Sequence, residues 1–369
     1  MARCIVRAAH CPIPWVRGLS SGSLPRRSLP ILALALIALC AGNAGPGASQ
    51  EDLEEARRLA GAGRLEAAAA AYRRHLAEDP RSFDAHFELG QVLLSADPRR
   101  AREHLAAAAE LQPDHAQAHA RLAQALILLN DMEDAARELT RARDLDPSQP
   151  STRYNLARLY EGQQKNDAAL GEYLAFLNLA PHDPRANAVR QRLALFYENN
   201  ERLDEALRLY DEILAAEPAH AAALNARADI LYRRTRYDEA LVGYEAVMAL
   251  DPSSWSAHAN AAFIHRLRGD LGKAVLHYRR AIELNPENIT SQYFLGAVYA
   301  DRGEDAPAME QFERVVAMQP DHPLVHYSIG KLLLKRGDKD GAQREFERHR
   351  AIQAAERARS RTASTMGDP

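Results

Sequence analysis

Two pairs of histidines are the first candidates for chemistry in this sequence. His115 and His119 lie four residues apart, as do His322 and His326. Two histidines at that spacing can share one face of a helix and bind a metal ion. A protein metal site needs three or four converging ligands, however, and no H-E-x-x-H motif and no cysteine after Cys40 is present to complete one. We therefore expect no metal site.

No set of residues typical of an enzyme active site appears elsewhere in the repeated part of the chain. It contains no glycine-rich phosphate loop, and no G-x-S-x-G motif occurs after residue 50. The abundant carboxylates, such as Glu54 and Glu55, fit charged helix faces or first helical turns. Because no nucleophile, base and metal set converges, the sequence predicts a protein that is not an enzyme, with no catalytic residues and no cofactor.

The elements that position these residues are marked by regularly spaced prolines. Proline lacks an N–H and its ring clashes with the preceding helical turn, so each one marks the end of a helical unit. The prolines are Pro80, Pro113, Pro147, Pro181, Pro218, Pro252, Pro286 and Pro320, at intervals of 33, 34, 34, 37, 34, 34 and 34 residues.

Small and large apolar residues recur in phase with the prolines. An alanine stands twelve residues before each proline and a large apolar residue four residues after that alanine, so both share a helix face. The alanines are Ala68, Ala101, Ala135, Ala169, Ala206, Ala240, Ala274, Ala308 and, continuing the series, Ala342. The large residues are Tyr72, Leu105, Leu139, Tyr173, Tyr210, Tyr244, Tyr278, Phe312 and Phe346. A second small slot holds Ala56, Gly90, Ala123, Ala157, Ala194, Ala228, Ala262, Gly296 and Gly330.

This pattern resembles the tetratricopeptide repeat, which has 34 residues and the signature W-x2-L-G-x2-Y…A-x3-F…P. Residues 292–299, followed by Ala308, Phe312 and Pro320, match the signature except for its tryptophan. The resemblance covers residues 51–355 in about nine repeats. It implies an all-α fold, a right-handed α-solenoid in which antiparallel helix hairpins stack as a superhelix.

The repeats also predict where the turns and irregularities fall. The 33-residue interval shortens one hairpin turn near residues 95–97, and three extra residues between Pro181 and Asn187 lengthen one loop. The ninth repeat lacks its proline. The residues expected in tight turns are Gly63, Asn130, Asp131, Asn199, Asn200, Gly269, Asp270, Gly303, Gly337 and Asp338.

Residues 1–44 have the features of a targeting segment. They contain five arginines and no acid, then an apolar run over residues 29–39 and small residues up to Ala44. That run is shorter than the roughly 20 residues that span a bilayer. A basic start, short apolar centre and small-residue end are typical of a secretory signal peptide. We expect export to the periplasm or exterior, with a mature chain that begins near Gly45 and a flexible linker over residues 45–50.

Three alternatives for this segment stay open. Arg26 and Arg27 before the apolar run resemble a twin-arginine export signal. Cys40 follows a sequence similar to a lipobox, which would make a membrane-anchored lipoprotein, although Leu39 stands where a small residue is expected. An arginine-bearing, acid-free leader also fits an organelle transit peptide. At the other end, residues 356–369 are expected to form a helix end and a disordered tail, frayed from about Ser360.

Composition narrows the class of partner. The chain has 47% hydrophobic but only 6% aromatic residues, which suits thin helices packed through small side chains. Its formal net charge of -3 would become -8 without the five arginines of residues 1–44. A nucleic-acid-binding domain is expected to be strongly basic, so we expect no nucleic acid. We expect membrane contact only through the targeting segment, if it is retained or lipidated.

The family resemblance implies that the first helices of the hairpins line a concave groove in which peptides or partner helices bind. Arg121, Asn155, Arg158 and Arg192 come from adjacent repeats and are expected to point one way, similar to the carboxylate clamp of co-chaperone tetratricopeptide domains. Such donors hold acidic groups through charge-assisted hydrogen bonds. A second cluster mixes aromatic rings with donors, as binding hot spots do. Its members are Asn260, Phe263, Arg266, Tyr293 and Phe294, and Lys331 occupies the same inner face further on.

The expected function is therefore a non-enzymatic scaffold or adaptor, outside the cytoplasm, that binds a protein or peptide partner. The alternative is a targeting or regulatory subunit of a separately encoded enzyme or of a secretion or assembly complex. The sequence does not separate these two functions.

Overall fold

The computed structural model describes residues 46–365, which form eighteen helices and no strand. Consecutive helices pair as antiparallel hairpins, nine in all within the described residues. This confirms the predicted all-α fold built of about nine antiparallel helix hairpins. The targeting segment expected for residues 1–44 lies outside the described residues.

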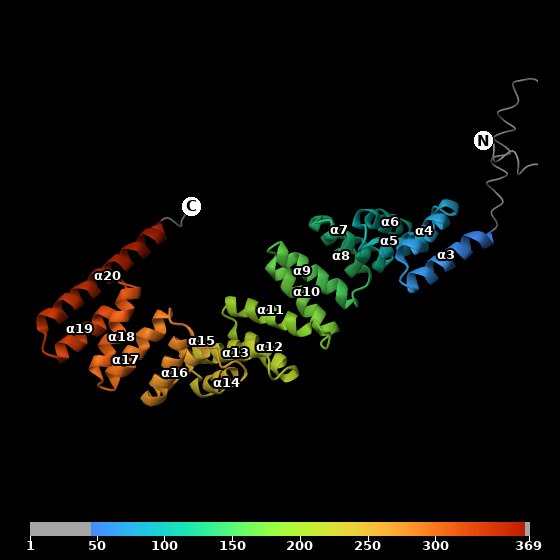
Figure 1. Ribbon diagram of the computed structural model, residues 1–369. Coiled ribbons are helices and arrows are strands. Elements are labelled where there is room, and N and C mark those ends of the chain that lie inside the picture. Colours follow the sequence, from blue (N-terminus) through green and yellow to red (C-terminus); the bar gives the residue numbers. More distant parts are fainter. Residues whose placement is uncertain (1–45, 366–369) are drawn as a thin grey trace, which may run out of the picture. The chain divides into compact units, whose positions relative to one another are not determined.

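The chain divides into two compact units, which are described separately. In unit 1, which ends at Leu179, four hairpins stack one on the next (Figure 1). Its helices are α3 (Pro46–Gly61), α4 (Leu65–Glu78), α5 (Phe83–Leu93), α6 (Pro98–Leu111), α7 (Ala116–Leu128), α8 (Met132–Leu145), α9 (Pro150–Gly162) and α10 (Asn166–Leu179).

Unit 2 begins at Ala180, in the loop that the sequence predicts to be lengthened, and holds five hairpins. Its helices are α11 (Ala186–Asn199), α12 (Leu203–Ala216), α13 (Ala221–Arg233), α14 (Tyr237–Leu250), α15 (Trp255–Leu267), α16 (Leu271–Leu284), α17 (Ile289–Asp301), α18 (Asp305–Met318), α19 (Val325–Lys335) and α20 (Lys339–Thr365).

The small and large slots form the core of each hairpin. Every alanine of the two small slots is buried, and Leu105 and Tyr244 in the large slot are fully buried. A Cβ added at Gly90 would lie 2.5 Å from Cγ of Leu105, and one added at Gly296 would lie 2.7 Å from Cε1 of Phe312. Glycine is therefore required where the large residue presses against the first helix.

The hairpin turns follow one rule. In eight of the nine described hairpins, the residue two positions before the second helix has a positive φ, as at Gly63, Asn130 and Gly303. Glycine and asparagine adopt this conformation most readily. Of the two asparagines predicted for the fifth turn, Asn200 lies in it, whereas Asn199 is the last residue of α11 and Glu201 takes the left-handed position.

Three further observations concern the shortened hairpin turn, the predicted linker and the C-terminal helix. The turn at residues 95–97 has no positive-φ residue, and Asp97 caps α6 by accepting from the Arg100 N–H at 3.2 Å. The linker predicted for residues 45–50 is helical from Pro46, a residue that suits the first turn of a helix. At the other end, α20 continues through Thr365, beyond the predicted solenoid boundary at 355 and past Ser360.

Candidate functional site

An open groove runs between two first helices of unit 1, α7 and α9. Its volume is about 710 Å³. It brings together Arg121, Asn155 and Arg158, three of the predicted groove residues. The lining is completed by Ala116, Gln117, Ala120, Gln124, Ile127, Leu128, Met132, Gln149, Ser151, Thr152, Leu159, Gly162 and Gln163.

The positive charge of this groove lacks an internal counter-charge. Arg121 donates a hydrogen bond to the neutral amide of Gln124 at 3.1 Å. Among the described residues, no carboxylate lies within ion-pair distance of Arg121 or Arg158. Helix α7 contains no acidic residue, and the one acid of α9, Glu161, accepts a hydrogen bond from Tyr173 at 2.8 Å. The groove therefore suits an anionic occupant.

The same repeat position in the first hairpin behaves differently. Arg57 follows the small residue Ala56, as Arg158 follows Ala157. Arg57 forms ion pairs with Asp84 at 2.9 Å and Glu88 at 2.8 Å, so its charge is balanced. In mutagenesis, Arg158 is therefore the test position and Arg57 the matched control.

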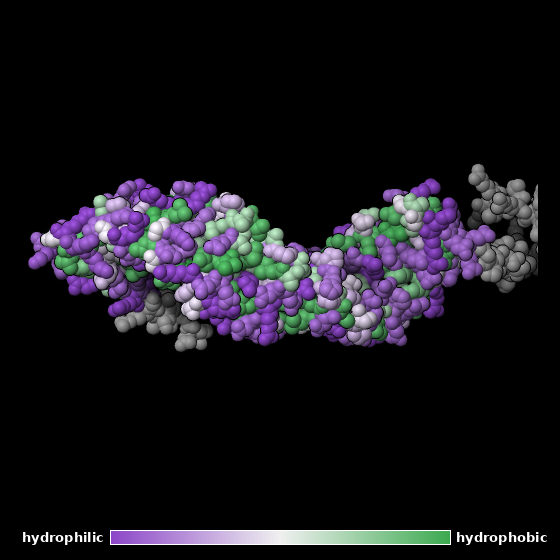
Figure 2. Space-filling model, turned by 90° about the horizontal axis from the view of Figure 1, so that it is seen from below, coloured by the Kyte–Doolittle hydropathy of each residue, from purple (hydrophilic) through white to green (hydrophobic). Residues whose placement is uncertain are grey.

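The groove also offers apolar surface. Leu128 at its end is 54% exposed, although it is a large aliphatic side chain. On the face drawn in Figure 2, hydrophobic residues gather in patches on a mostly hydrophilic surface. Exposed apolar residues ringed by polar ones are typical of interaction sites.

In unit 2 the predicted aromatic cluster forms, but two of its polar members bind within the unit. The Phe294 ring packs edge to face against Phe263 and Tyr293, each with ring centres 5.3 Å apart. Arg266 lies over the Phe294 ring and donates to Asp301 at 2.9 Å. The Asn260 amide donates to Asp229 at 3.1 Å. Asn260 and Arg266 are thus partly occupied by internal partners.

Two further predicted residues are not among the residues that line the groove. Arg192 is an exposed residue of α11, in unit 2 rather than with Arg121 and Arg158, so its grouping with them stays a prediction. Lys331 is an exposed residue of α19 whose ammonium lies 5.9 Å from the centre of the Tyr327 ring.

Family models match most of the chain between residues 53 and 359. A family model described as "Tetratricopeptide repeat" matches residues 53–97, 95–150, 154–212, 192–254 and 306–359. A second, "TPR repeat", matches residues 264–303. The chain belongs to the tetratricopeptide repeat family. No curated protein matches it.

Several solved structures resemble this tetratricopeptide repeat protein. The C-terminal part of a repeat protein from Cytophaga hutchinsonii matches with a TM-score of 0.50 at 12% identity, over 65% of this chain and 97% of that one. The MamA protein matches with a TM-score of 0.43 at 22% identity, over 46% and 93%. YrrB, titled "a TPR protein with an unusual peptide-binding site", gives 0.44 at 20% identity, over 52% and 96%. The first of these supports the fold alone.

Tetratricopeptide proteins are typically interaction scaffolds that bind protein or peptide partners. The family and fold therefore indicate protein–protein interaction as the general function.

Within residues 46–365, no helix is long and apolar enough to cross a membrane.

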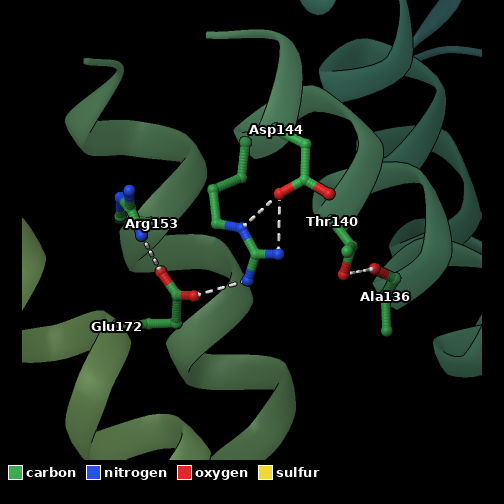
Figure 3. A network of polar contacts seen from close by, with 6 residues as sticks. Ala136, Thr140, Asp144, Arg153 and Glu172 are labelled. Atoms are coloured by element: carbon green, nitrogen blue, oxygen red, sulfur yellow. Dashed lines mark hydrogen bonds and ion pairs between the residues drawn. The ribbon is translucent and has the colours of Figure 1, made fainter. Parts of the chain in front are cut away.

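In this tetratricopeptide protein a buried carboxylate ties α9, one of the two helices that line the groove, to α8 and α10. Glu172 on α10 is 7% exposed. It accepts hydrogen bonds from Arg143 of α8 at 2.8 Å and from Arg153 of α9 at 2.9 Å, and Figure 3 shows Glu172 and Arg153 turned toward each other. One carboxylate thus fixes three helices, including the helix that presents Asn155 and Arg158.

The histidine pairs have structural partners. His119 and His326 each approach a proline carbonyl six residues earlier through Nε2, at 3.0 and 2.7 Å. Through Nδ1 they approach Glu138 at 2.7 Å and Glu345 at 2.6 Å. No group of three or more His, Cys, Asp or Glu that could hold a metal occurs in the part of the chain that the structure describes. These histidines hold the loop between repeats to the next hairpin.

Sequence reasoning missed two groups of residues here. Gln149 and Met132 line the groove from the segment before α9 and from the start of α8, where no slot pattern marked them. The loop-binding histidines had a usable signal, since a proline, a histidine six residues later and an acid nineteen residues after that recur around His119 and His326.

Proposed function

We propose that this chain is an exported protein–protein interaction scaffold that binds a segment of a partner protein in the groove between α7 and α9. The observation on which the proposal rests is an open groove with two arginines that no carboxylate of the described residues neutralises. A charge left without a partner at a surface is available to pair with a ligand.

The chemistry of the lining supports a peptide occupant. Gln117, Gln124 and Gln149 contribute side-chain amides, which both donate and accept hydrogen bonds, as a peptide backbone does. Leu128 and Leu159 add apolar contact area. We infer that the bound segment carries at least one acidic side chain, which pairs with Arg121 or Arg158 through charge-assisted hydrogen bonds.

Export from the cytoplasm is a further part of the proposal. So is a role in binding rather than in catalysis. Export is supported by the basic, acid-free residues 1–44 with their short apolar run. N-terminal sequencing of the protein from cells tests it: a mature chain that begins near Gly45 is expected. An intact Met1 or a lipidated Cys40 would reject cleavage after Ala44.

Affinity purification from the native source tests the binding site. The wild-type protein, Arg158→Glu and the control Arg57→Gln are compared, and co-purified proteins are quantified by mass spectrometry. Arg158→Glu is expected to lose a specific partner at least tenfold, because the reversed charge repels an acidic segment. Arg57→Gln is expected to retain it. Equal recovery by all three proteins would remove this groove as the binding site.

A further inference from the structure

Two histidine–histidine pairs join the helices of the second and the seventh hairpin. The Nδ1 atoms of His86 on α5 and His104 on α6 lie 3.1 Å apart. The Nδ1 atoms of His258 on α15 and His277 on α16 also lie 3.1 Å apart. All four rings are half-buried. Among the described residues, no carboxylate lies within ion-pair distance of any of the four.

The first histidine of each pair also holds the loop that enters its hairpin. His86 donates through Nε2 to the carbonyl oxygen of Pro80 at 3.2 Å, and the carbonyl of Pro252 accepts a hydrogen bond from His258. Both histidines stand four residues before the small-slot residue of their helix, where the family signature has its tryptophan. A ring that can take up a proton therefore fastens the loop to the hairpin.

The hydrogen bonds of such a pair limit the number of protons that it can hold. A carbonyl oxygen only accepts, so Nε2 of His86 carries a hydrogen and Nδ1 of the neutral ring accepts from Nδ1 of His104. One added proton can be shared, because one of the two Nδ1 atoms still accepts. A second proton sets two N–H groups and two positive charges against each other. The doubly protonated pair is therefore expected to separate.

Two other hairpins have a carboxylate in place of the second ring. His119 contacts Glu138 at 2.7 Å and His326 contacts Glu345 at 2.6 Å. Each of these histidines also holds the proline carbonyl six residues earlier. A carboxylate accepts from a protonated ring and balances its charge. These two hairpins are therefore internal controls in which acid does not break the pair.

Around the His86–His104 pair the other charges are mixed. Burial and the adjacent His86 lower the pKa of His104. Arg73 of α4 and Arg100 of α6 act in the same direction, whereas Glu103 of α6 opposes them. The other charged residues of α5 and α7 have contacts of their own: Asp84 and Glu88 with Arg57, His119 with Glu138, and Arg121 with Gln124.

Around the His258–His277 pair the neighbours disfavour added protons. Burial lowers the pKa of both rings. His258, His265 and Lys273 add to the effect at His277, and Arg280 adds to it at His258. The acids of this hairpin and of the helices packed against it are Asp238 with Arg268, Glu239 with Arg236, Asp301 with Arg266, Asp270 beside His265, Glu283 with Arg280, and the exposed Glu245.

The sign of the pH dependence follows from these shifts. Because His104, His258 and His277 have lowered pKa values in the folded chain, the closed pairs are fully favoured above about pH 6.5. The unfolded or opened segment binds protons more readily, so the closed pairs lose this advantage as the pH falls.

We propose that the His86–His104 and His258–His277 pairs are pH-sensitive switches, each within its own unit. In mild acid both rings of a pair are protonated, the pair separates, and the loop over residues 79–86 or 251–258 is released. The loops held by His119 and His326 stay closed. None of the four switch histidines lines the groove of unit 1, so the switches do not depend on the proposed binding site.

Hydrogen–deuterium exchange of the full chain, followed by mass spectrometry and corrected for the intrinsic effect of pH on exchange, tests the proposal. Peptides over residues 79–86 and 251–258 are compared with the control peptides over residues 112–119 and 319–326. Between about pH 7 and about pH 5, we expect local opening to increase at least about tenfold in the first two peptides. In the control peptides we expect less than about a twofold increase.

Two kinds of variant assign the response to the pairs. His104→Glu and His277→Glu copy the histidine–glutamate pairs of the control hairpins, and each is expected to remove the response of its own loop. The double variant His258→Gln with His277→Gln removes the charge altogether. It copies the eighth hairpin, where Gln292 donates to the Pro286 carbonyl at 3.2 Å, and it is also expected to remove the response of residues 251–258.

The internal controls make the result decisive. Equal acceleration of exchange in all four peptides would indicate general unfolding and would overturn the proposal. So would unchanged exchange of residues 79–86 and 251–258 at about pH 5, or a response that persists in the variants. Circular dichroism at about pH 7 shows whether each variant is folded, and the double glutamine variant serves where the glutamate variant is not.

Discussion

Glu172 accepts a hydrogen bond from Arg153 at 2.9 Å, and both residues are largely withdrawn from solvent. The same carboxylate binds Arg143 at 2.8 Å, so removal of Glu172 deprives the partly buried Arg153 of this ion pair and leaves Arg143 with Asp144 alone. We expect Glu172→Ala to lower the free energy of unfolding of unit 1 by about 2–4 kcal/mol. Denaturant unfolding checks this value. The control is Glu133→Ala at an exposed position, which is expected to change the free energy of unfolding by less than about 0.5 kcal/mol. Equal effects of the two substitutions would contradict the role of Glu172.

A helical glycine is expected to be irreplaceable only where a large residue touches it, as Leu105 touches Gly90 of the second small slot. In Gly90→Ala the new Cβ would lie 2.5 Å from Leu105, so overpacking is expected to cost about 1–3 kcal/mol. Gly171, on α10, has open space where a Cβ would stand. Gly171→Ala is therefore expected to stabilise unit 1 by up to about 1 kcal/mol. Thermal unfolding of both variants measures the difference, and a common sign would count against this packing.

The slot residues of the core were predictable because local periodicity alone determines which side of a helix they occupy. Arg121, Asn155 and Arg158 were predicted to share a surface for the same reason, and the groove between α7 and α9 contains all three. The hydrogen bonds of Asn260 were not predictable, since they depend on Asp229 one repeat earlier and on its distance from that helix. The contribution of Gln149 to the groove was not predictable, because Gln149 lies before α9 begins and outside the helical periodicity.

Two tyrosines of the large slot are expected to respond oppositely to loss of the hydroxyl. Tyr244 donates to Asp229 at 2.7 Å, whereas the buried hydroxyl of Tyr278 has no hydrogen-bond partner among the described residues. Tyr244→Phe is expected to destabilise unit 2 by about 1–2 kcal/mol. Tyr278→Phe removes an unsatisfied polar group and is expected to be neutral or stabilising by about 1 kcal/mol. Chemical denaturation of both variants under one set of conditions decides; a clear loss of stability in Tyr278→Phe would contradict the assignment.

Unit 2 is expected to lose stability in mild acid through a histidine cluster. His277 lies 3.1 Å from His258 between Nδ1 atoms, and its ring stacks on His265 at 5.5 Å. Burial and the adjacent His258, His265 and Lys273 lower the pKa of His277 to about 4. The unfolded chain then binds the proton more readily than the folded one, so stability is complete above about pH 6.5 and falls toward pH 4.

One pKa unit corresponds to about 1.4 kcal/mol, and solvent screening reduces the effect at this half-buried ring. We therefore expect His277 to contribute about 1 kcal/mol to the loss of stability of unit 2 between pH 7 and pH 5. His277→Gln is expected to reduce this pH dependence. Denaturation midpoints at both pH values, in the wild type and the variant, measure it. Parallel pH profiles for the two proteins would show that His277 does not titrate as described.

Contact between the groove and a partner is the central claim, and site-specific photocrosslinking tests it most directly. A photoreactive amino acid replaces Leu128, which is 54% exposed in the groove, or the control Leu276, which is 66% exposed on α16. The account predicts crosslinking at position 128 to an acidic segment of a specific protein, loss of this product with Arg158→Glu, and none of it at position 276. A product at position 128 that persists unchanged with Arg158→Glu, or that forms equally at position 276, would contradict the account.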